Sequence, residues 1–149
     1  MHGNLLRITN AFPLFNIKPI TEEDFWRVCK NMKVIVLQFP LMVNGYYERR
    51  GGRDYILLNQ GLTGFVWLHT ALHELCHVLC DEPLYAEQFT LYKRFGIPSS
   101  DPREKFADAF ALIGLIPIGN LEGLLEEDIV DDLHNMCQAR IKVFQLYGL

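Results

Sequence analysis

The sequence lacks the features that mark several large classes of protein. It has no apolar stretch long enough to cross a bilayer, and its first residues do not form the basic and then apolar pattern of a secretory signal. It has no polybasic run, and its formal net charge of -4 is mild. A positive surface for nucleic acid or anionic lipid is therefore not expected. Together these absences predict a cytoplasmic protein that binds neither nucleic acid nor membrane directly.

Cysteine occurs, but without the spacing of a zinc ribbon or a disulfide framework. The sequence holds 4 cysteines and no CxxC pair. Cys76 and Cys80 stand one helical turn apart in an apolar segment, and we expect Cys76 to pack in the core. Without an export signal, the thiols are expected to be reduced.

The length and the apolar pattern predict the fold class. The chain has 149 residues, 50% of them hydrophobic, without repeats or low-complexity tracts, which suits one compact domain over residues 1–149. We expect an α+β fold in which a small antiparallel sheet packs on a helical bundle. The predicted elements are a helix after Thr21, strands over residues 33–39 and 54–59, and helices over residues 65–80, 101–116 and in the C-terminal tail.

The segment His73-Glu74-Leu75-Cys76-His77 is an HExxH motif within the predicted helix over residues 65–80. One helical turn separates the two histidines, so both imidazoles face the same way and can bind one zinc ion. Glu74 can then act as a general base that takes a proton from the zinc-bound water. The alternative is a metal-free helix with hydrogen-bonded core histidines. The rest of the helix is apolar, and burying two imidazoles and a carboxylate there is costly unless they are paired or metal-bound, which favours the metal.

A catalytic zinc ion needs a third protein ligand, and Glu104 is the candidate. Glu104 and Asp108 lie on one face of the helix that begins at Asp101-Pro102. Glu104 could bind zinc while Asp108 orients an imidazole. The alternative is a capping box in which Glu104 bonds the backbone N–H of Asp101. The spacing does not decide between these two interpretations.

The HELCH segment and the later Glu-Lys-Phe-Ala-Asp-Ala-Phe-Ala-Leu-Ile-Gly-Leu-Ile-Pro segment together resemble the ImmA/IrrE metallopeptidase family, also called DUF955. That family pairs a HELxH helix with a helix of the form ExxANxFAxxLLxP. The resemblance covers roughly residues 30–149. It implies a gluzincin-like site in which His73, His77 and Glu104 bind Zn²⁺. It also implies an intracellular peptidase that cleaves a helix-turn-helix transcriptional repressor in phage, mobile-element or stress-response control.

The chain departs from the family pattern at three positions, none of which is a predicted ligand. Cys76 replaces a small residue, Asp108 stands where Asn is more common, and Gly114 interrupts the second helix. An alternative function is a non-catalytic regulatory or interaction protein that contains zinc, and a weaker one is a hydrolase of small molecules. A metallopeptidase also uses a donor for the oxyanion, and the sequence leaves this role open among four tyrosines: Tyr46, Tyr47, Tyr85 and Tyr92.

Overall fold

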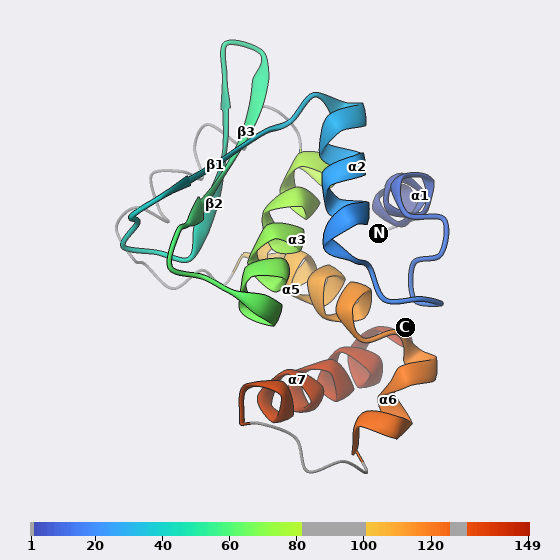
Figure 1. Cartoon of the computed structure of the whole chain (residues 1–149). Helices are drawn as coiled ribbons and strands as arrows, with labels where there is room; N and C mark the ends of the chain where they lie inside the picture. The colour runs from blue at the N-terminus through green and yellow to red at the C-terminus, as the bar shows by residue number, and fades with distance from the viewer. Residues whose placement is uncertain (1, 82–100, 126–130) are drawn as a thin grey trace.

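The computed structural model describes residues 2–81, 101–125 and 131–149 and has the expected α+β class (Figure 1). Three strands and a larger set of helices make up these ranges. In chain order the elements are α1 (His2–Ala11), α2 (Glu22–Met32), β1 (Ile35–Phe39), β2 (Gly45–Arg50), β3 (Arg53–Asn59), α3 (Gly64–Cys80), α5 (Pro102–Leu115), α6 (Ile118–Leu125) and α7 (Asp131–Tyr147).

The sheet is mixed rather than antiparallel throughout, which corrects the prediction from the sequence. Its strand order is β1-β3-β2, with β2 antiparallel and β1 parallel to β3. A tight turn at Gly51 and Gly52, whose φ angles are 58° and 75°, joins β2 to β3. This hairpin fixes β3 against β2, and β3 then enters the sheet between β2 and β1. Because β1 and β2 are not neighbours, their short connection does not make a hairpin.

The first two helices form for different reasons: a local capping signal starts α2, and tertiary packing stabilises α1. Thr21 caps α2 as predicted, and its side chain and that of Asp24 form a reciprocal capping box. The helix α1 was not predicted, because its Gly, Asn and Thr residues have low helix propensity. It forms where Ile8 and Phe12, one turn apart, are buried in the core. The burial of these two side chains in the core therefore stabilises α1.

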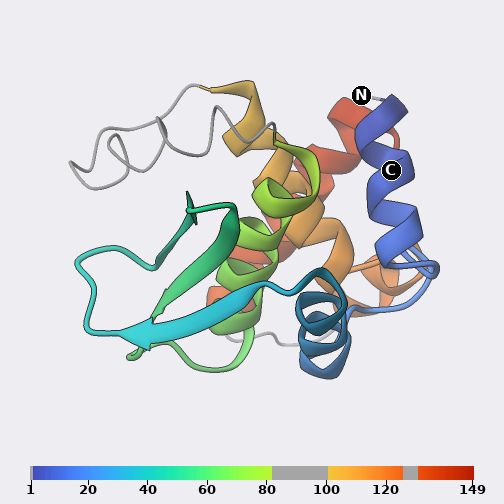
Figure 2. The same cartoon turned by 90° about the horizontal axis from the view of Figure 1, so that it is seen from above.

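The helix α3 lies between the sheet and α5. It contacts β2 and β3 on one side and α5 on the other (Figures 1 and 2). Its buried residues include Leu72, Leu75 and Cys76, so the expectation that Cys76 packs in the core is confirmed. A polar side chain on the side of α3 that faces α5 is consequently shielded from solvent, because α5 covers it and the sheet covers the opposite side of α3.

Arg140 attaches α7 to the end of α5 and is completely buried. Its guanidinium donates hydrogen bonds to the carbonyl of Ile116 at 2.7 Å, the carbonyl of Leu149 at 2.6 Å and Oδ1 of Asn16 at 3.1 Å. A buried arginine is stable only when its N–H groups have such partners. These bonds hold the last helix at a fixed position beside α5.

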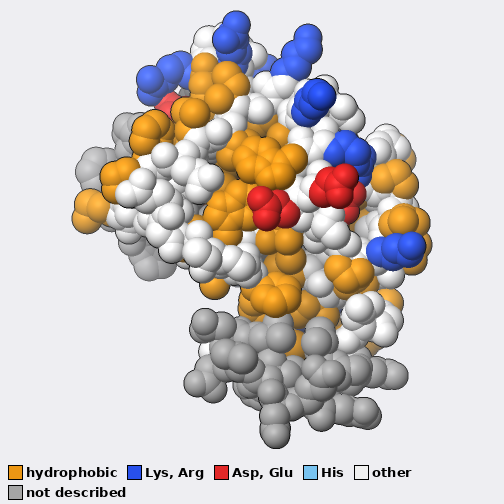
Figure 3. All heavy atoms as spheres, in the orientation of Figure 1, with side chains coloured by type: hydrophobic (Ala, Val, Ile, Leu, Met, Phe, Trp, Pro, Cys, Tyr) orange, Lys and Arg blue, Asp and Glu red, His pale blue; other side chains and the backbone are white. Residues whose placement is uncertain are grey.

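The face formed by α2 and β1 is apolar at its centre and carries Lys and Arg along one rim (Figure 3). Among the hydrophobic side chains of these two elements, Trp26 on α2 and Leu37 and Phe39 on β1 are exposed. No side chain of a described histidine is visible on this face, so the histidines of α3 do not open toward it. Within the described ranges, no helix combines the length and the apolar character needed to cross a membrane.

Candidate metal centre

The helix α3 places both motif histidines and the intervening glutamate in its shielded part. The exposed fractions are 8% for His73, 2% for His77 and 2% for Glu74. The rings of the two histidines have their centroids 5.0 Å apart, as expected for side chains one turn apart on one helical face. The geometry predicted from the HExxH spacing is thus present within a single helix.

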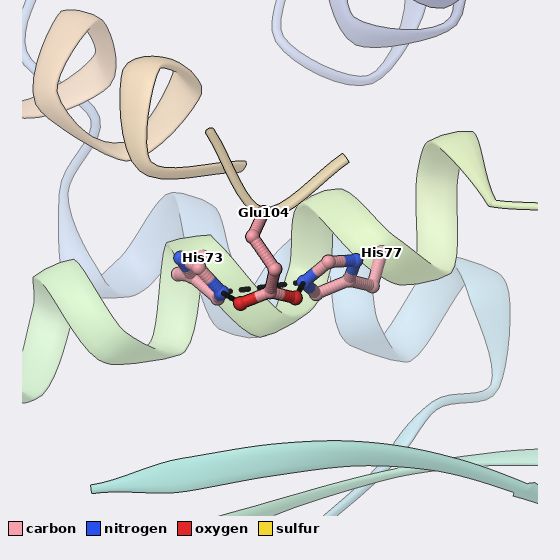
Figure 4. Close-up of side chains that lie close together, drawn as sticks. All are labelled: His73, His77 and Glu104. Atoms are coloured by element: carbon pink, nitrogen blue, oxygen red, sulfur yellow. Dashed lines mark hydrogen bonds and ion pairs between the residues drawn. The ribbon is translucent and has the colours of Figure 1, made fainter. Parts of the chain in front are cut away.

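The third predicted ligand comes from the first turn of α5. Asp101 is the N-cap of this helix and accepts a hydrogen bond from the backbone N–H of Arg103 at 2.8 Å, with Pro102 at the first helical position. The carboxylate of Glu104 points between the two imidazoles (Figure 4). Its Oε2 lies 3.2 Å from Nε2 of His73, and its Oε1 lies 2.8 Å from Nε2 of His77.

A carboxylate also contacts the other nitrogen of each imidazole. Oδ1 of Asp108 lies 2.7 Å from Nδ1 of His73, and Oδ2 of Asp81 lies 2.8 Å from Nδ1 of His77. Asp108 was predicted to lie next to an imidazole, whereas the role of Asp81 was missed. The signal for Asp81 was present in the sequence, because this residue follows His77 by one helical turn.

These contacts define the tautomer in which the two histidines can bind a metal ion. A carboxylate accepts from Nδ1–H, so each Nε2 keeps its lone pair when the ring is neutral. The neutral state therefore directs two nitrogen lone pairs and one carboxylate toward the same point.

This donor set fits a divalent cation. One ligand atom from each of His73, His77 and Glu104 can be chosen so that all three lie within 4.8 Å of one another. Two imidazole nitrogens and one carboxylate oxygen match the ligands of a catalytic zinc site. In a tetrahedral zinc site, neighbouring ligand atoms are roughly 3.3 Å apart, close to the contacts seen here. Glu74 is not a member of this group of donors within the described part of the chain.

Four tyrosines were considered from the sequence as donors to the oxyanion. Tyr46 and Tyr47 are on β2, and the Tyr47 hydroxyl donates to Oδ1 of Asp54 at 2.7 Å. Burial raises the pKa of Tyr47, and the nearby Asp54 carboxylate raises it further, so this hydroxyl stays protonated. Tyr85 and Tyr92 lie outside the described residues. The structure thus leaves the oxyanion donor open.

The comparisons with known proteins give one result. The family model Peptidase_M78, described as an IrrE N-terminal-like domain, matches residues 29–144. This range contains α3 and α5, and with them Glu74 and the five residues in contact at the centre, namely His73, His77, Asp81, Glu104 and Asp108. Neither the curated proteins nor the solved structures give a significant match.

Proposed function

The chain belongs to the Peptidase_M78 family of IrrE N-terminal-like domains, and from this premise we propose that it is a zinc-dependent endopeptidase with a protein substrate. Family membership supports a metallopeptidase-type function. The observation that carries the proposal is the meeting of His73 Nε2, His77 Nε2 and the Glu104 carboxylate at one point, with a carboxylate behind each imidazole.

His73, His77 and Glu104 would hold the ion through the three groups that converge. When bound, a zinc ion polarises the scissile carbonyl and makes a water molecule acidic enough to attack it at neutral pH. Asp108 and Asp81 each hold an Nδ1–H and thereby keep both Nε2 lone pairs directed at the ion. The two aspartates therefore act as positioning residues, which do not touch the substrate.

Glu74 is proposed as the general base. It follows His73 directly in the helix and is 2% exposed, so its carboxylate works in a site with little competing water. Its position directly after the first histidine of the HExxH motif supports a role in taking the proton of the attacking water and delivering it to the leaving amine. A closed structural zinc site has no use for such a base, which favours the peptidase over the non-catalytic alternative.

The proposed substrate is a helix-turn-helix transcriptional repressor, as the family resemblance implies. Peptide hydrolysis needs the scissile carbonyl to lie close to the ion in a defined orientation. A folded repressor must therefore expose a segment or unfold locally before cleavage. We expect selective cleavage of that partner and little activity on generic unfolded proteins such as casein.

The experiment is a cleavage assay with the repressor encoded next to this gene. Purified protein loaded with zinc is incubated with that repressor, and the products are identified by mass spectrometry. A single specific cut that disappears with a chelator and in Glu74→Gln supports the proposal. A zinc-loaded protein that binds the repressor without cutting it would establish the non-catalytic alternative.

A further inference from the structure

A groove of roughly 500 Å³ runs between α5 and α7 and reaches α3 at His69. We call it the α5–α7 groove. The helix α5 contributes Lys105, Asp108 and Leu112, and α7 contributes Met136, Lys142 and Val143 to its walls. Of these side chains, only Asp108 was predicted from the sequence to lie at the metal centre.

The α5–α7 groove approaches the candidate metal centre at two of its lining residues, Asp108 and His69. Asp108 contacts His73 Nδ1 at 2.7 Å with one carboxylate oxygen, yet its side chain remains 57% exposed and forms part of the groove wall. His69 stands one helical turn before His73 and lines the same groove. His69 and His73 are about 6 Å apart along the axis of α3, a distance that an extended peptide covers in about two residues.

The lining of the groove is apolar along α7 and cationic at its rim. Met136, Val143 and Leu146 recur at helical spacing and form one stripe on α7. This stripe passes from buried Val143 to Leu146, which is 75% exposed, so it extends beyond the part that α5 covers. Lys105 and Lys142 are both exposed, whereas the Asp108 carboxylate is engaged with His73.

We propose that the α5–α7 groove is a substrate subsite that takes a large aliphatic side chain flanked by an acidic residue, within about two residues of the cleaved bond. The stripe on α7 buries the aliphatic side chain. Lys105 and Lys142 attract the neighbouring carboxylate, and a basic residue there is repelled. This inference rests on the proposed peptidase function and adds the sequence preference of its substrate.

The test measures peptide binding without turnover. Three short fluorescein-labelled peptides share a Gly-Ser background and carry Glu-Leu-Glu, Glu-Ala-Glu or Lys-Leu-Lys at the centre. Their affinities for the zinc-loaded Glu74→Gln protein are measured by fluorescence anisotropy. We expect the Glu-Leu-Glu peptide to bind about 50-fold more tightly than the Glu-Ala-Glu peptide, because the alanine side chain buries three carbon atoms fewer than leucine.

The charge preference is tested by reversal. The Lys-Leu-Lys peptide should bind about tenfold more weakly than the Glu-Leu-Glu peptide at low salt, and added salt should reduce the difference. In the double variant Lys105→Glu, Lys142→Glu, which reverses both cationic side chains of the groove, the order should invert, so that the Lys-Leu-Lys peptide binds more tightly. The matched control is the double variant Lys18→Glu, Lys30→Glu, which makes the same charge change at two exposed positions outside the groove and should keep the original order. A merely damaged fold cannot produce such an inversion.

The subsite would be overturned by equal binding of all three peptides, by no binding of any, or by the original order persisting in the Lys105→Glu, Lys142→Glu variant. The two proposals fail differently. Metal-dependent cleavage of the repressor together with absent peptide preference would overturn the subsite alone. Absence of metal-dependent hydrolysis of any protein would overturn the peptidase function, and the subsite with it.

Discussion

The carboxylate of Asp81 lies 2.8 Å from Nδ1 of His77, one turn earlier in the same helix. The corresponding partner of His73 is Asp108, which comes from a different helix. The two aspartates differ in exposure, because the side chain of Asp81 is 8% exposed and that of Asp108 is 57% exposed. The centre is thus held on one side by a local contact and on the other by the packing of α3 against α5.

This difference predicts unequal effects on metal affinity. Asp81→Ala should weaken zinc binding by about 10- to 100-fold, because the imidazole of His77 loses the partner that fixes its proton and orientation. Asp108→Ala should have a smaller effect, since water can replace an exposed carboxylate. Chelator competition gives both dissociation constants. Asp81→Asn keeps an acceptor oxygen and should recover part of the affinity; equal losses in Asp81→Ala and Asp81→Asn would contradict an orienting role.

The number of zinc ions per chain tests the ligand set. We expect about one zinc ion in the wild type and a large loss in His73→Ala, His77→Ala and Glu104→Ala, because each removes one of three protein ligands. Elemental analysis of the purified proteins measures this directly. Glu23→Ala, an exposed change in the first turn of α2, is the control and should retain the metal. Full occupancy in Glu104→Ala would show that Glu104 is not a ligand.

Removal of the proposed base should separate catalysis from metal binding. Glu74→Gln keeps the shape of the side chain and should retain zinc, but hydrolysis should slow by a factor of roughly 100 to 10,000 because no group takes the proton of the attacking water. Rates are compared on the same repressor, with zinc content measured for both proteins. Equal turnover of the two proteins would exclude this mechanism.

The cap of α5 predicts a pH-dependent stability. The hydrogen bond from the Arg103 side chain holds the pKa of Asp101 below its ordinary value of 3.8. A carboxyl group whose pKa is lowered in the folded state stabilises that state above its unfolded pKa, and the stabilisation is lost as the pH falls through the folded pKa. Asp101→Ala should therefore cost about 1 kcal/mol of unfolding free energy at neutral pH.

Urea denaturation of the metal-free protein measures this cost across pH. The difference between the wild type and Asp101→Ala should be constant above about pH 4 and should shrink toward about pH 2. A difference that stays constant over the acidic range would show that the charge of Asp101 does not contribute.

Gly45 is predicted to be necessary where the sheet meets α3. A Cβ atom at this position would lie 2.8 Å from Cγ2 of Thr70 on α3 and 3.0 Å from the carbonyl oxygen of Leu57 on β3. Gly45→Ala should therefore destabilise the protein by about 1–3 kcal/mol, because the backbone of β3 cannot move easily. Gly119→Ala is the control, since a Cβ there meets open space. The midpoint of thermal unfolding is measured for both variants. Equal midpoints would contradict the argument.

Much of the architecture followed from local patterns. The cap at Thr21, the start of α5 at Asp101 and Pro102, and the helix that carries His73 and His77 were all predicted where they occur. These predictions succeed because the helical repeat is rigid, so spacing along the chain sets which side chains share a face. The resemblance to the family was also visible in the sequence, and the family match confirms it.

The tertiary structure determined how side chains from different helices and strands are placed relative to one another. Spacing left Glu104 undecided between a helix cap and a ligand, and only the packing of α5 on α3 places its carboxylate beside both imidazoles. The parallel position of β1, the formation of α1 and the α5–α7 groove likewise depend on contacts between segments distant in sequence. The sequence by itself determined the pair of histidines, because one rigid helix holds both. The burial of side chains from several helices in one core determined what surrounds that pair, and no local pattern encodes the relative position of two helices.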